Sequence, residues 1–194
     1  MTDRYNTIKN FLDTNGWGEA KRESLAADAS FRRYERLTLG GSRRMLMDAP
    51  PPNERVDKFI TIAQQLDFLG FSTPKIYAQD IKRGLLIIED LGNQTFTNAL
   101  SVKKIKIEAD LYKLAVDVLI KLHSFPLKLI IPPNTKTYSI DSLLAETQLL
   151  CDWTWGALFG TKPEAKVINS YQAAWKETLA PIINTDNTLV LRDY

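Results

Sequence analysis

The chain ends with the letters LRDY, which place a carboxylate where it could take part in acid–base chemistry. Residues 189–191 form a short apolar run that is typical of a buried strand. Asp193 follows directly after this predicted strand, with Arg192 beside it. A buried strand that ends on an acidic residue suggests that this residue has a chemical role. On the pattern alone, however, the letters RDY more often form an ion-paired turn.

Two further segments offer main-chain groups to a ligand. The loop AADAS, residues 26–30, has small side chains that would let backbone N–H groups approach a polyanion, although Asp28 in an ordinary Asx turn fits the same letters. Arg33 and Arg44, on the strands beside it, are candidate cations, or else part of a solvated strand face. Past the apolar strand within residues 84–90, free backbone donors and acceptors could bind the edge of a flat heterocycle.

Three further groups of residues are candidates for function. Glu146, Trp153 and Trp155 could line a sugar site, because aromatic faces and a carboxylate suit a hydroxylated ring. Aromatic residues at helical spacing are more often part of a core. His123 is the single histidine and precedes a predicted turn, so packing or capping is its ordinary role. The clusters FRRYER and SRR could suggest RNA binding, but we expect no nucleic-acid partner because the net charge is only +2.

The elements that would position these residues form a mainly β part followed by a helical part, an α+β fold. Alternation and turn signals predict antiparallel strands at residues 20–27, 30–39, 40–49, 74–80 and 84–90. Helical periodicity predicts helices at residues 2–15, 53–70, 107–122, 139–151 and 163–179. Suitable residues at the helix starts are Thr2, Asn53 and Ser139 as caps, and Pro163 in the first turn. The expected domains are a small lobe at 1–90 and a helical lobe at 91–194, joined by a hinge at 89–93.

Composition limits the class of protein. The 194 residues are 44% hydrophobic and 25% charged, which is ordinary for a globular chain. A single cysteine, Cys151, excludes an internal disulfide and indicates a reducing compartment. The chain shows no signal peptide and no apolar run near the roughly 20 residues that span a bilayer. We therefore expect a cytoplasmic protein without a membrane partner, and the sequence does not indicate its oligomeric state.

In order along the chain, these segments resemble the phosphotransferase family related to protein kinases that contains aminoglycoside, choline and sugar kinases. Several local matches point to the branch of cell-wall amino-sugar kinases that phosphorylate N-acetylmuramate or N-acetylglucosamine at the anomeric carbon. The matching segments are DASFRRYERL for the first hairpin, RMLMDAPPP for the third strand and its turn, LLIIEDLG for the hinge, LHSFP for the end of the first large-lobe helix, and LLAETQLLCDWTWG for the substrate-side helix. The resemblance runs from about residue 4 to the end of the chain.

The resemblance implies a kinase-like fold and ATP-dependent phosphorylation of a small hydroxylated molecule, most specifically an amino sugar. Asp193 matches the residue that orients the attacking hydroxyl, with Arg192 packed alongside it. The implied nucleotide contacts are Asp28, Ala29, Ser30, Phe31 and Arg33 for the phosphates, and the backbone of Glu89 and Leu91 for adenine. Glu146 and Trp153 fall on the substrate side, and His123 matches a position near the catalytic loop.

The chain also departs from the family pattern. In the family, an Asn and an Asp that hold Mg²⁺ follow the position of Asp193, and the chain ends before both. We therefore expect the chain to be an N-terminal portion of a longer protein. We expect it to have little or no activity and no metal ligands of its own. The third strand has no Lys; Arg33 and Arg44 remain alternatives for the cation, and Glu54 is a poor partner in a helix's first turn. A non-catalytic nucleotide-binding fragment and a protein-interaction module are the alternatives from other classes.

Overall fold

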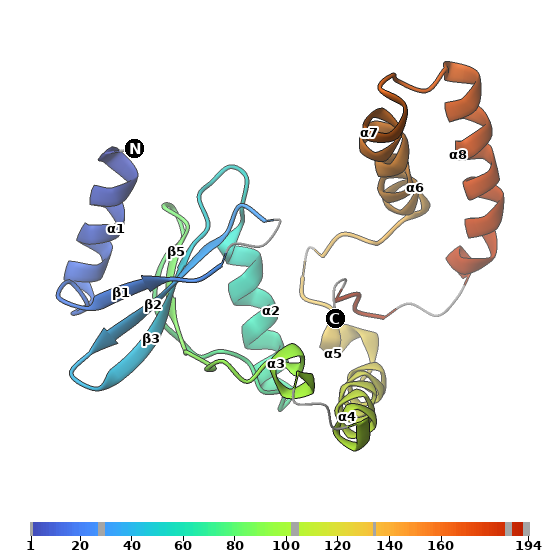
Figure 1. Ribbon diagram of the computed structural model, residues 1–194. Coiled ribbons are helices and arrows are strands. Elements are labelled where there is room, and N and C mark those ends of the chain that lie inside the picture. Colours follow the sequence, from blue (N-terminus) through green and yellow to red (C-terminus); the bar gives the residue numbers. More distant parts are fainter. Residues whose placement is uncertain (1, 27–29, 102–104, 134, 185–187, 192–194) are drawn as a thin grey trace. The chain divides into compact units, whose positions relative to one another are not determined.

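The computed structural model describes residues 2–26, 30–101, 105–133, 135–184 and 188–191 (Figure 1). The chain divides into two compact units, residues 1–122 and 123–194, which we describe separately. The first unit holds a sheet with its helices, and the second unit is helical. The predicted α+β class is therefore confirmed. The units divide within the predicted helical lobe, and the lobe boundary at 90/91 stays a prediction.

A five-stranded antiparallel sheet forms the centre of the first unit. Its strands are β1 (Lys21–Ser24), β2 (Arg33–Leu39), β3 (Ser42–Asp48), β4 (Ile76–Asp80) and β5 (Leu85–Ile88). Their order across the sheet is β1-β2-β3-β5-β4, so β5 lies between β3 and β4. A strand with neighbours on both sides and covered faces should be apolar throughout, and all four residues of β5 are buried. All five predicted strands are confirmed.

Three glycines explain how the strands connect. Gly40 and Gly41 join β2 to β3 with φ values of +53° and +80°, as a two-residue hairpin turn with two positive φ angles requires. Gly84, at the start of β5, has φ +67° and packs against the backbone of Ala49. A Cβ on Gly84 would lie 2.0 Å from the Ala49 carbonyl oxygen. Only glycine allows this close approach of the two strands.

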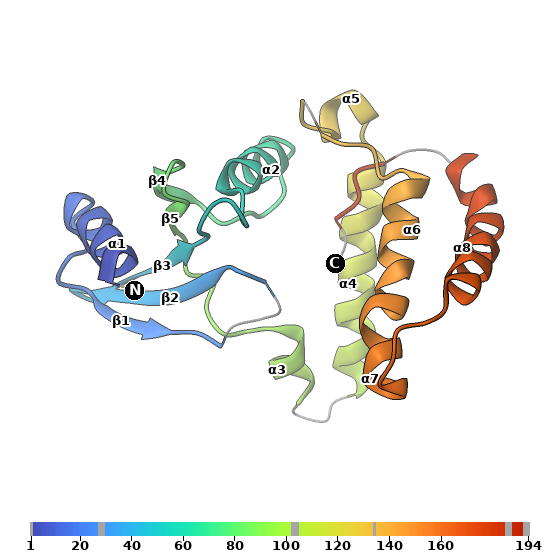
Figure 2. The same ribbon diagram turned by 90° about the horizontal axis from the view of Figure 1, so that it is seen from above.

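Helix α1 (Thr2–Thr14) covers one face of the sheet, and Figures 1 and 2 both show it there. Its buried residues meet apolar side chains from three strands. This cluster consists of Ile8, Phe11, Leu12, Leu37, Leu46, Leu85 and Ile87. Full burial of one such side chain stabilises the fold by about 1.5–3 kcal/mol. The predicted helix is confirmed, although Tyr5 of the predicted apolar face is 60% exposed.

Helix α2 (Val56–Phe68) packs on the opposite face. Its cluster with the sheet consists of Met45, Met47, Ala49, Val56, Ile60, Leu86 and Ile88, with Tyr34 packed against it. The prediction that Asn53 caps this helix is wrong. The Glu54 N–H donates to the Pro50 carbonyl (3.3 Å), so a turn precedes the helix, and Arg55 is the N-cap without a side-chain cap bond. Glu54 therefore lies before α2 and not in its first turn.

Two helices complete the first unit. A short helix, α3 (Phe96–Leu100), was not predicted; the Thr95 side chain caps it by accepting from the Asn98 N–H (3.2 Å). Helix α4 (Ile105–His123) confirms the predicted long helix. Its predicted apolar face is only partly covered, because Leu122 is buried but Leu114 is 56% exposed.

The second unit is built from short and long helices in succession. These are α5 (Leu127–Ile130), α6 (Ile140–Leu149), the π-helical turn η1 (Leu150–Thr154), α7 (Trp155–Phe159), α8 (Ala165–Leu179) and the 3₁₀ turn η2 (Ala180–Asn184). Ser139 caps α6 as predicted, accepting from the Ser142 N–H (3.4 Å). Pro163 does not begin α8, which starts two residues later with Glu164 at its N-cap. The Tyr171 hydroxyl joins α8 to α6 through the Thr147 carbonyl (2.9 Å).

Candidate functional site

The segment that follows β5 presents main-chain groups in fixed positions. The Glu89 N–H donates to the Lys75 carbonyl (2.8 Å), and the Glu89 carboxylate accepts from the Lys75 N–H (3.2 Å). The group that Glu89 can offer to a ligand is therefore its carbonyl. Within the described ranges, the Leu91 N–H makes no hydrogen bond, and its side chain is 66% exposed. A carbonyl and an N–H two residues apart can bind a ring edge that has one donor and one acceptor.

Arg36 on β2 holds this segment against the sheet. Its Nε and Nη2 donate to the two carboxylate oxygens of Asp90 (2.6 and 3.1 Å), and Nη2 also donates to Asn93 Oδ1 (2.8 Å). The Gly92 N–H donates to Asp90 Oδ1 (3.0 Å). The side chains of Arg36 and Asp90 are only 9% and 4% exposed. We call Arg36, Asp90 and Asn93 the hinge clamp; it fixes the backbone on both sides of Asp90.

Arg36 and Asp90 of the hinge clamp each stabilise the charged form of the other. The hydrogen bonds from Arg36 are the main cause that lowers the pKa of Asp90 below its ordinary value; burial opposes them, and the Gly92 N–H and the charge of Arg36 add to the lowering. The hydrogen bond to Asp90 likewise raises the pKa of Arg36. Both groups are therefore charged at neutral pH. Such a bidentate, charge-assisted pair is among the strongest polar contacts that a protein makes.

The predicted phosphate-side residues are described only in part. Asp28 and Ala29 lie outside the described residues. The Ser30 hydroxyl accepts from the Arg32 N–H (3.2 Å), and the Phe31 side chain is 64% exposed. Phe31 thus lies open to solvent next to the start of β2, while Ser30 shapes the turn before it.

Arg33 and Arg44, the two alternatives for the cation, lie on the sheet face that α1 covers. Arg33 is in register with Asp48, and residues directly opposite on paired strands point to the same face. Asp48 in turn binds Arg4 of α1. The Arg44 guanidinium stacks 3.8 Å from the ring centre of Tyr77. The structure therefore engages Arg44 in a cation–π contact and separates both arginines from the face that α2 covers.

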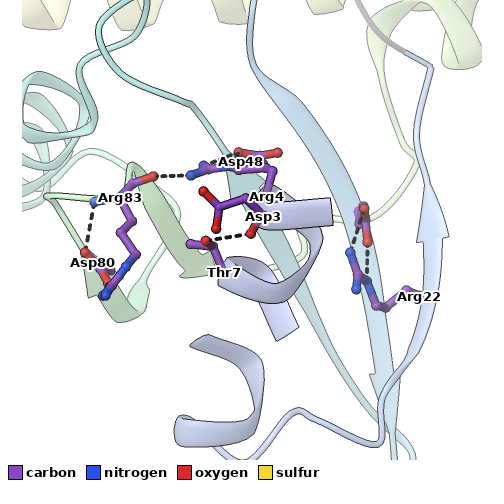
Figure 3. Close-up of polar contacts among 8 residues, drawn as sticks. Asp3, Arg4, Thr7, Arg22, Asp48, Asp80 and Arg83 are labelled. Atoms are coloured by element: carbon purple, nitrogen blue, oxygen red, sulfur yellow. Dashed lines mark hydrogen bonds and ion pairs between the residues drawn. The ribbon is translucent and has the colours of Figure 1, made fainter. Parts of the chain in front are cut away.

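An ion pair that the sequence did not indicate joins α1 to the sheet. Arg4 donates through Nε (3.0 Å) and Nη2 to Asp48, which is 6% exposed, and through Nη1 to the Arg83 carbonyl (2.8 Å) (Figure 3). Arg83 is itself held by Asp80 (2.8 Å). This arrangement satisfies a buried carboxylate on β3 and fixes the start of α1 against the turn before β5.

The predicted substrate-side residues both lie in the second unit. The Glu146 carboxylate accepts a hydrogen bond from the Tyr138 hydroxyl. Trp153 lies in the π-helical turn η1 and is 74% exposed, so it is not a core residue. Trp155 instead packs on Phe159, with ring centres 4.7 Å apart. Single π-helical turns within helices occur frequently at functional sites.

A groove of about 520 Å³ lies between α6 and α8, lined by polar residues such as Asp141, Gln148, Gln172 and Lys176. The Gln172 side chain donates to Gln148 (2.8 Å) within it. Neither Glu146 nor Trp153 lines this groove. The predicted sugar-side residues and the groove are therefore separate features of the second unit.

The residues at the end of the chain were predicted to follow a strand. Asp193 and Arg192 lie outside the described residues. Residues 188–191 form no strand, although Leu189 is 6% exposed and so is buried as predicted; Val190 is 48% exposed. The strand prediction is therefore wrong for this segment, because no described strand pairs with it. His123 is the last residue of α4, and its side chain is exposed rather than packed.

Neither a cluster of metal ligands nor a membrane-spanning helix is found among the residues that the structure describes. No three His, Cys, Asp or Glu side chains in these ranges come together as metal ligands. Among the same residues, no helix has the length and the apolar character that a bilayer crossing requires.

An antiparallel sheet with helices on both faces, followed by a clamped segment that leads into further helices, is the arrangement of a kinase-like phosphotransferase. A sequence model of the phosphotransferase enzyme family matches residues 21–194, and the chain belongs to this family.

Within this family, the chain is similar to curated amino-sugar kinases. The chain is 34% identical over 195 residues to the N-acetylmuramate/N-acetylglucosamine kinase of Pseudomonas putida, which covers 96% of this chain and 54% of the relative. It is 31% identical over 182 residues to the protein of the same name in Pseudomonas aeruginosa, covering 92% of this chain and 52% of the relative. The protein of that name in Caulobacter vibrioides is 30% identical, with 89% and 54% covered. The chain spans about half the length of these relatives.

Sequence reasoning missed the hinge clamp and the Arg4–Asp48 pair. The sequence carries little signal for the first, because alternation with Leu37 places Arg36 on the opposite face of its strand without showing that this face is buried. Once buried, an arginine requires a partner such as a carboxylate. Nothing in the sequence indicates which carboxylate it is, because Asp90 is 54 residues away along the chain.

Proposed function

We propose that this chain supplies the nucleotide-binding part of an ATP-dependent phosphotransferase that acts on a hydroxyl of a small molecule, most specifically an amino sugar at its anomeric position. The observation that carries the proposal is the family match over residues 21–194. The three relatives share the name N-acetylmuramate/N-acetylglucosamine kinase, which supports an amino sugar as the substrate. The proposal places the protein in the cytoplasm, where ATP is available.

For the nucleotide, we assign adenine to the main chain of Glu89 and Leu91. The exocyclic amino group of adenine is a donor and the adjacent ring nitrogen is an acceptor, which complements a carbonyl and an N–H. The hinge clamp supports this assignment, because a donor and an acceptor bind a rigid ring best when they do not have to be ordered first. The resemblance assigns the phosphates to residues 28–31 and to Arg33.

For the chemical step, we assign to Asp193 the orientation of the attacking sugar hydroxyl, with Arg192 beside it. Glu146 and Trp153 are assigned to the sugar, and the exposure of Trp153 supports a face that can stack on a pyranose ring. ATP-dependent transfer also calls for Mg²⁺, which would neutralise charge on the phosphates. The described residues do not fit such an ion, since no set of three possible ligands gathers among them. We therefore assign its ligands to none of the described residues.

The first test is thermal unfolding of the chain with ATP, with and without Mg²⁺, over a series of concentrations. Ligand that binds only the folded state stabilises it by about 2.7 kcal/mol at a concentration 100 times its Kd. We expect the midpoint to rise with ATP and to rise with adenosine as well. A midpoint that stays constant up to millimolar ATP would refute the nucleotide site.

The second test addresses the sugar. A chimera joins this chain to the remaining length of the Pseudomonas putida relative and is incubated with ATP and N-acetylglucosamine or N-acetylmuramate. We expect a sugar phosphate by mass spectrometry. The methyl glycoside of each sugar, in which the anomeric hydroxyl is blocked, is the matched control and should give none. Equal phosphorylation of the free sugar and its methyl glycoside would exclude the anomeric position.

A protein-interaction module is a second candidate that one observation favours. Consecutive turns of the second unit expose large apolar side chains: Leu149, Leu150, Trp153, Leu158 and Phe159 are each between 46% and 74% exposed. Patches of this kind often mark contact surfaces. This candidate predicts self-association in analytical ultracentrifugation and no change of the unfolding midpoint with ATP.

A further inference from the structure

A row of side chains lies along β2 on the sheet face that α2 covers. Arg32, at one end of this row, has no role in the proposed function. Arg36 is in register with Met45, which belongs to the cluster on this face, and Tyr34 packs against the same cluster. Arg36 holds the hinge clamp at the other end of the row. Arg32 lies four residues earlier, immediately before β2, and about 13 Å of extended chain separates the two positions.

Arg32 is turned toward α2 by an ion pair. Its Nε donates to Glu54 Oε2 (2.8 Å), and Glu54 lies two residues before the first residue of α2. The Glu54 side chain is 13% exposed, so the carboxylate is largely enclosed, whereas the Arg32 side chain is 37% exposed. Arg32 therefore has a fixed partner on one side and solvent access on the other. By contrast, the Arg36 side chain is 9% exposed and is fully engaged within the hinge clamp.

The neighbouring arginines are placed differently. Arg33, the next residue, points to the α1-covered face, where it is opposite Asp48. Arg44 stacks on Tyr77 on that same face. Arg22 forms a bidentate pair with Glu35 (2.6 and 3.0 Å). Of the arginines beside the predicted loop at 26–30, Arg32 is the one on the same face as the hinge clamp.

We propose that Arg32 binds the phosphates of the nucleotide and that Glu54 positions its guanidinium, an inference that rests on the nucleotide-binding function proposed above. The pair would take the part that a third-strand Lys and a helix Glu take in protein kinases, although β3 of this chain has no Lys. A guanidinium suits this part because its planar set of donors matches phosphate oxygens. A nucleotide with its ring at the hinge clamp would extend along β2 toward Arg32.

The experiment compares ATP with adenosine, which lacks the phosphates, by calorimetric titration of the whole chain without Mg²⁺. The variants are Arg32→Met and Arg32→Lys, with Arg22→Met as the matched control, because Arg22 is in register with Leu37 on the α1-covered face. We expect Arg32→Met to weaken ATP binding about 10- to 100-fold, the usual loss for charge-assisted hydrogen bonds, and to leave adenosine binding within about 2-fold. Arg32→Lys should recover part of the ATP affinity, and Arg22→Met should change it by less than about 3-fold.

Glu54→Gln tests the positioning role. We expect it to weaken ATP binding several-fold in the wild-type background and to have no further effect in the Arg32→Met background, because it acts through Arg32. An equal effect of Glu54→Gln in both backgrounds would overturn that role. Hydrogen exchange of the sheet amides in each variant verifies that the fold is intact.

The outcomes separate this inference from the proposed function. If the wild-type chain binds neither ATP nor adenosine, the nucleotide-binding function itself fails, and this inference fails with it. If the wild-type chain binds ATP and Arg32→Met binds it equally well, only the inference is overturned. A parallel loss of ATP and adenosine in Arg32→Met would also overturn it, because Arg32 would then support the hinge rather than contact phosphate.

Discussion

Replacing Arg36 by Met should destabilise the first unit far more than the same replacement of Arg22 on the neighbouring strand. Both arginines make bidentate pairs with a carboxylate, but their surroundings differ. The Arg36–Asp90 side chains are 9% and 4% exposed, whereas the Arg22–Glu35 side chains are 26% and 21% exposed. The two variants therefore differ in burial while the chemistry of the contact stays the same.

The magnitude follows from what each variant leaves behind. Without Arg36, the buried Asp90 carboxylate keeps the Gly92 N–H as its described partner. Breaking a buried ion pair from one side costs about 3–5 kcal/mol, and we expect about 3 kcal/mol here because Asp90 can take up a proton to relieve part of the cost. Loss of the partly exposed Arg22 pair should cost about 1 kcal/mol or less.

The assay is unfolding in urea followed by hydrogen-exchange mass spectrometry of peptides from β2 and β5. This readout is needed because three of the four tryptophans, Trp153, Trp155 and Trp175, lie in the second unit and would dominate fluorescence. An Arg36→Met variant that is no less stable than Arg22→Met would refute the role that we give to burial of the clamp.

Three further predictions can be checked with the same methods. Asp90→Asn should lose its destabilising effect as the pH falls. The pKa of Asp90 is lowered mainly by the hydrogen bonds from Arg36, so its contribution to stability is present above the unfolded value near 3.8 and is lost as the pH falls through the lower folded value. Urea midpoints of wild type and variant should therefore converge as the pH falls below about 4. Gly84→Ala should destabilise the sheet by more than about 2 kcal/mol, since its Cβ would lie 2.0 Å from the Ala49 carbonyl oxygen; an unchanged urea midpoint would contradict the close approach of the strands. Ser139→Ala should cost about 0.5–1 kcal/mol and speed hydrogen exchange in the first turn of α6 while leaving the sheet unaffected, and exchange that stays the same would exclude the cap.

Much of the first unit follows from local patterns in the sequence. The Gly40–Gly41 turn and the alternation on either side of it predict the β2–β3 hairpin, and both glycines have the positive φ that the turn needs. The apolar run ending at Ile88 predicts a central strand because only a strand with covered faces is apolar throughout. The predicted helix starts at residues 53 and 163 were less accurate. The helices begin at Val56 and Ala165, two to three residues later.

The polar contacts of the candidate site depend on information that is not local. The alternation of β2 predicts that Arg33 lies on one face of the sheet and that Arg32 and Arg36 lie on the other. It does not predict which face α1 covers and which face α2 covers. Asp90 and Asn93 meet Arg36 because β5 is inserted between β3 and β4, an order that crosses the sequence. The propensities of neighbouring residues do not determine the order of strands in a sheet. The partners of these arginines could therefore not be predicted from the spacing of residues along the chain.

The open turn between β2 and β3 gives the protein a convenient attachment point for a reporter. A Cβ at Gly40 or Gly41 would meet no atom within 4 Å, and Ser42 beside them is exposed. The single native thiol, Cys151, is buried in the other unit. A fluorophore attached through Ser42→Cys would therefore label one site of a folded chain. Arg36 of the hinge clamp lies on β2 four residues before the turn, and Ser42 is in register with Leu39 on the α1-covered face. This label could therefore follow ligand binding by fluorescence without occupying the face that the ligand would use.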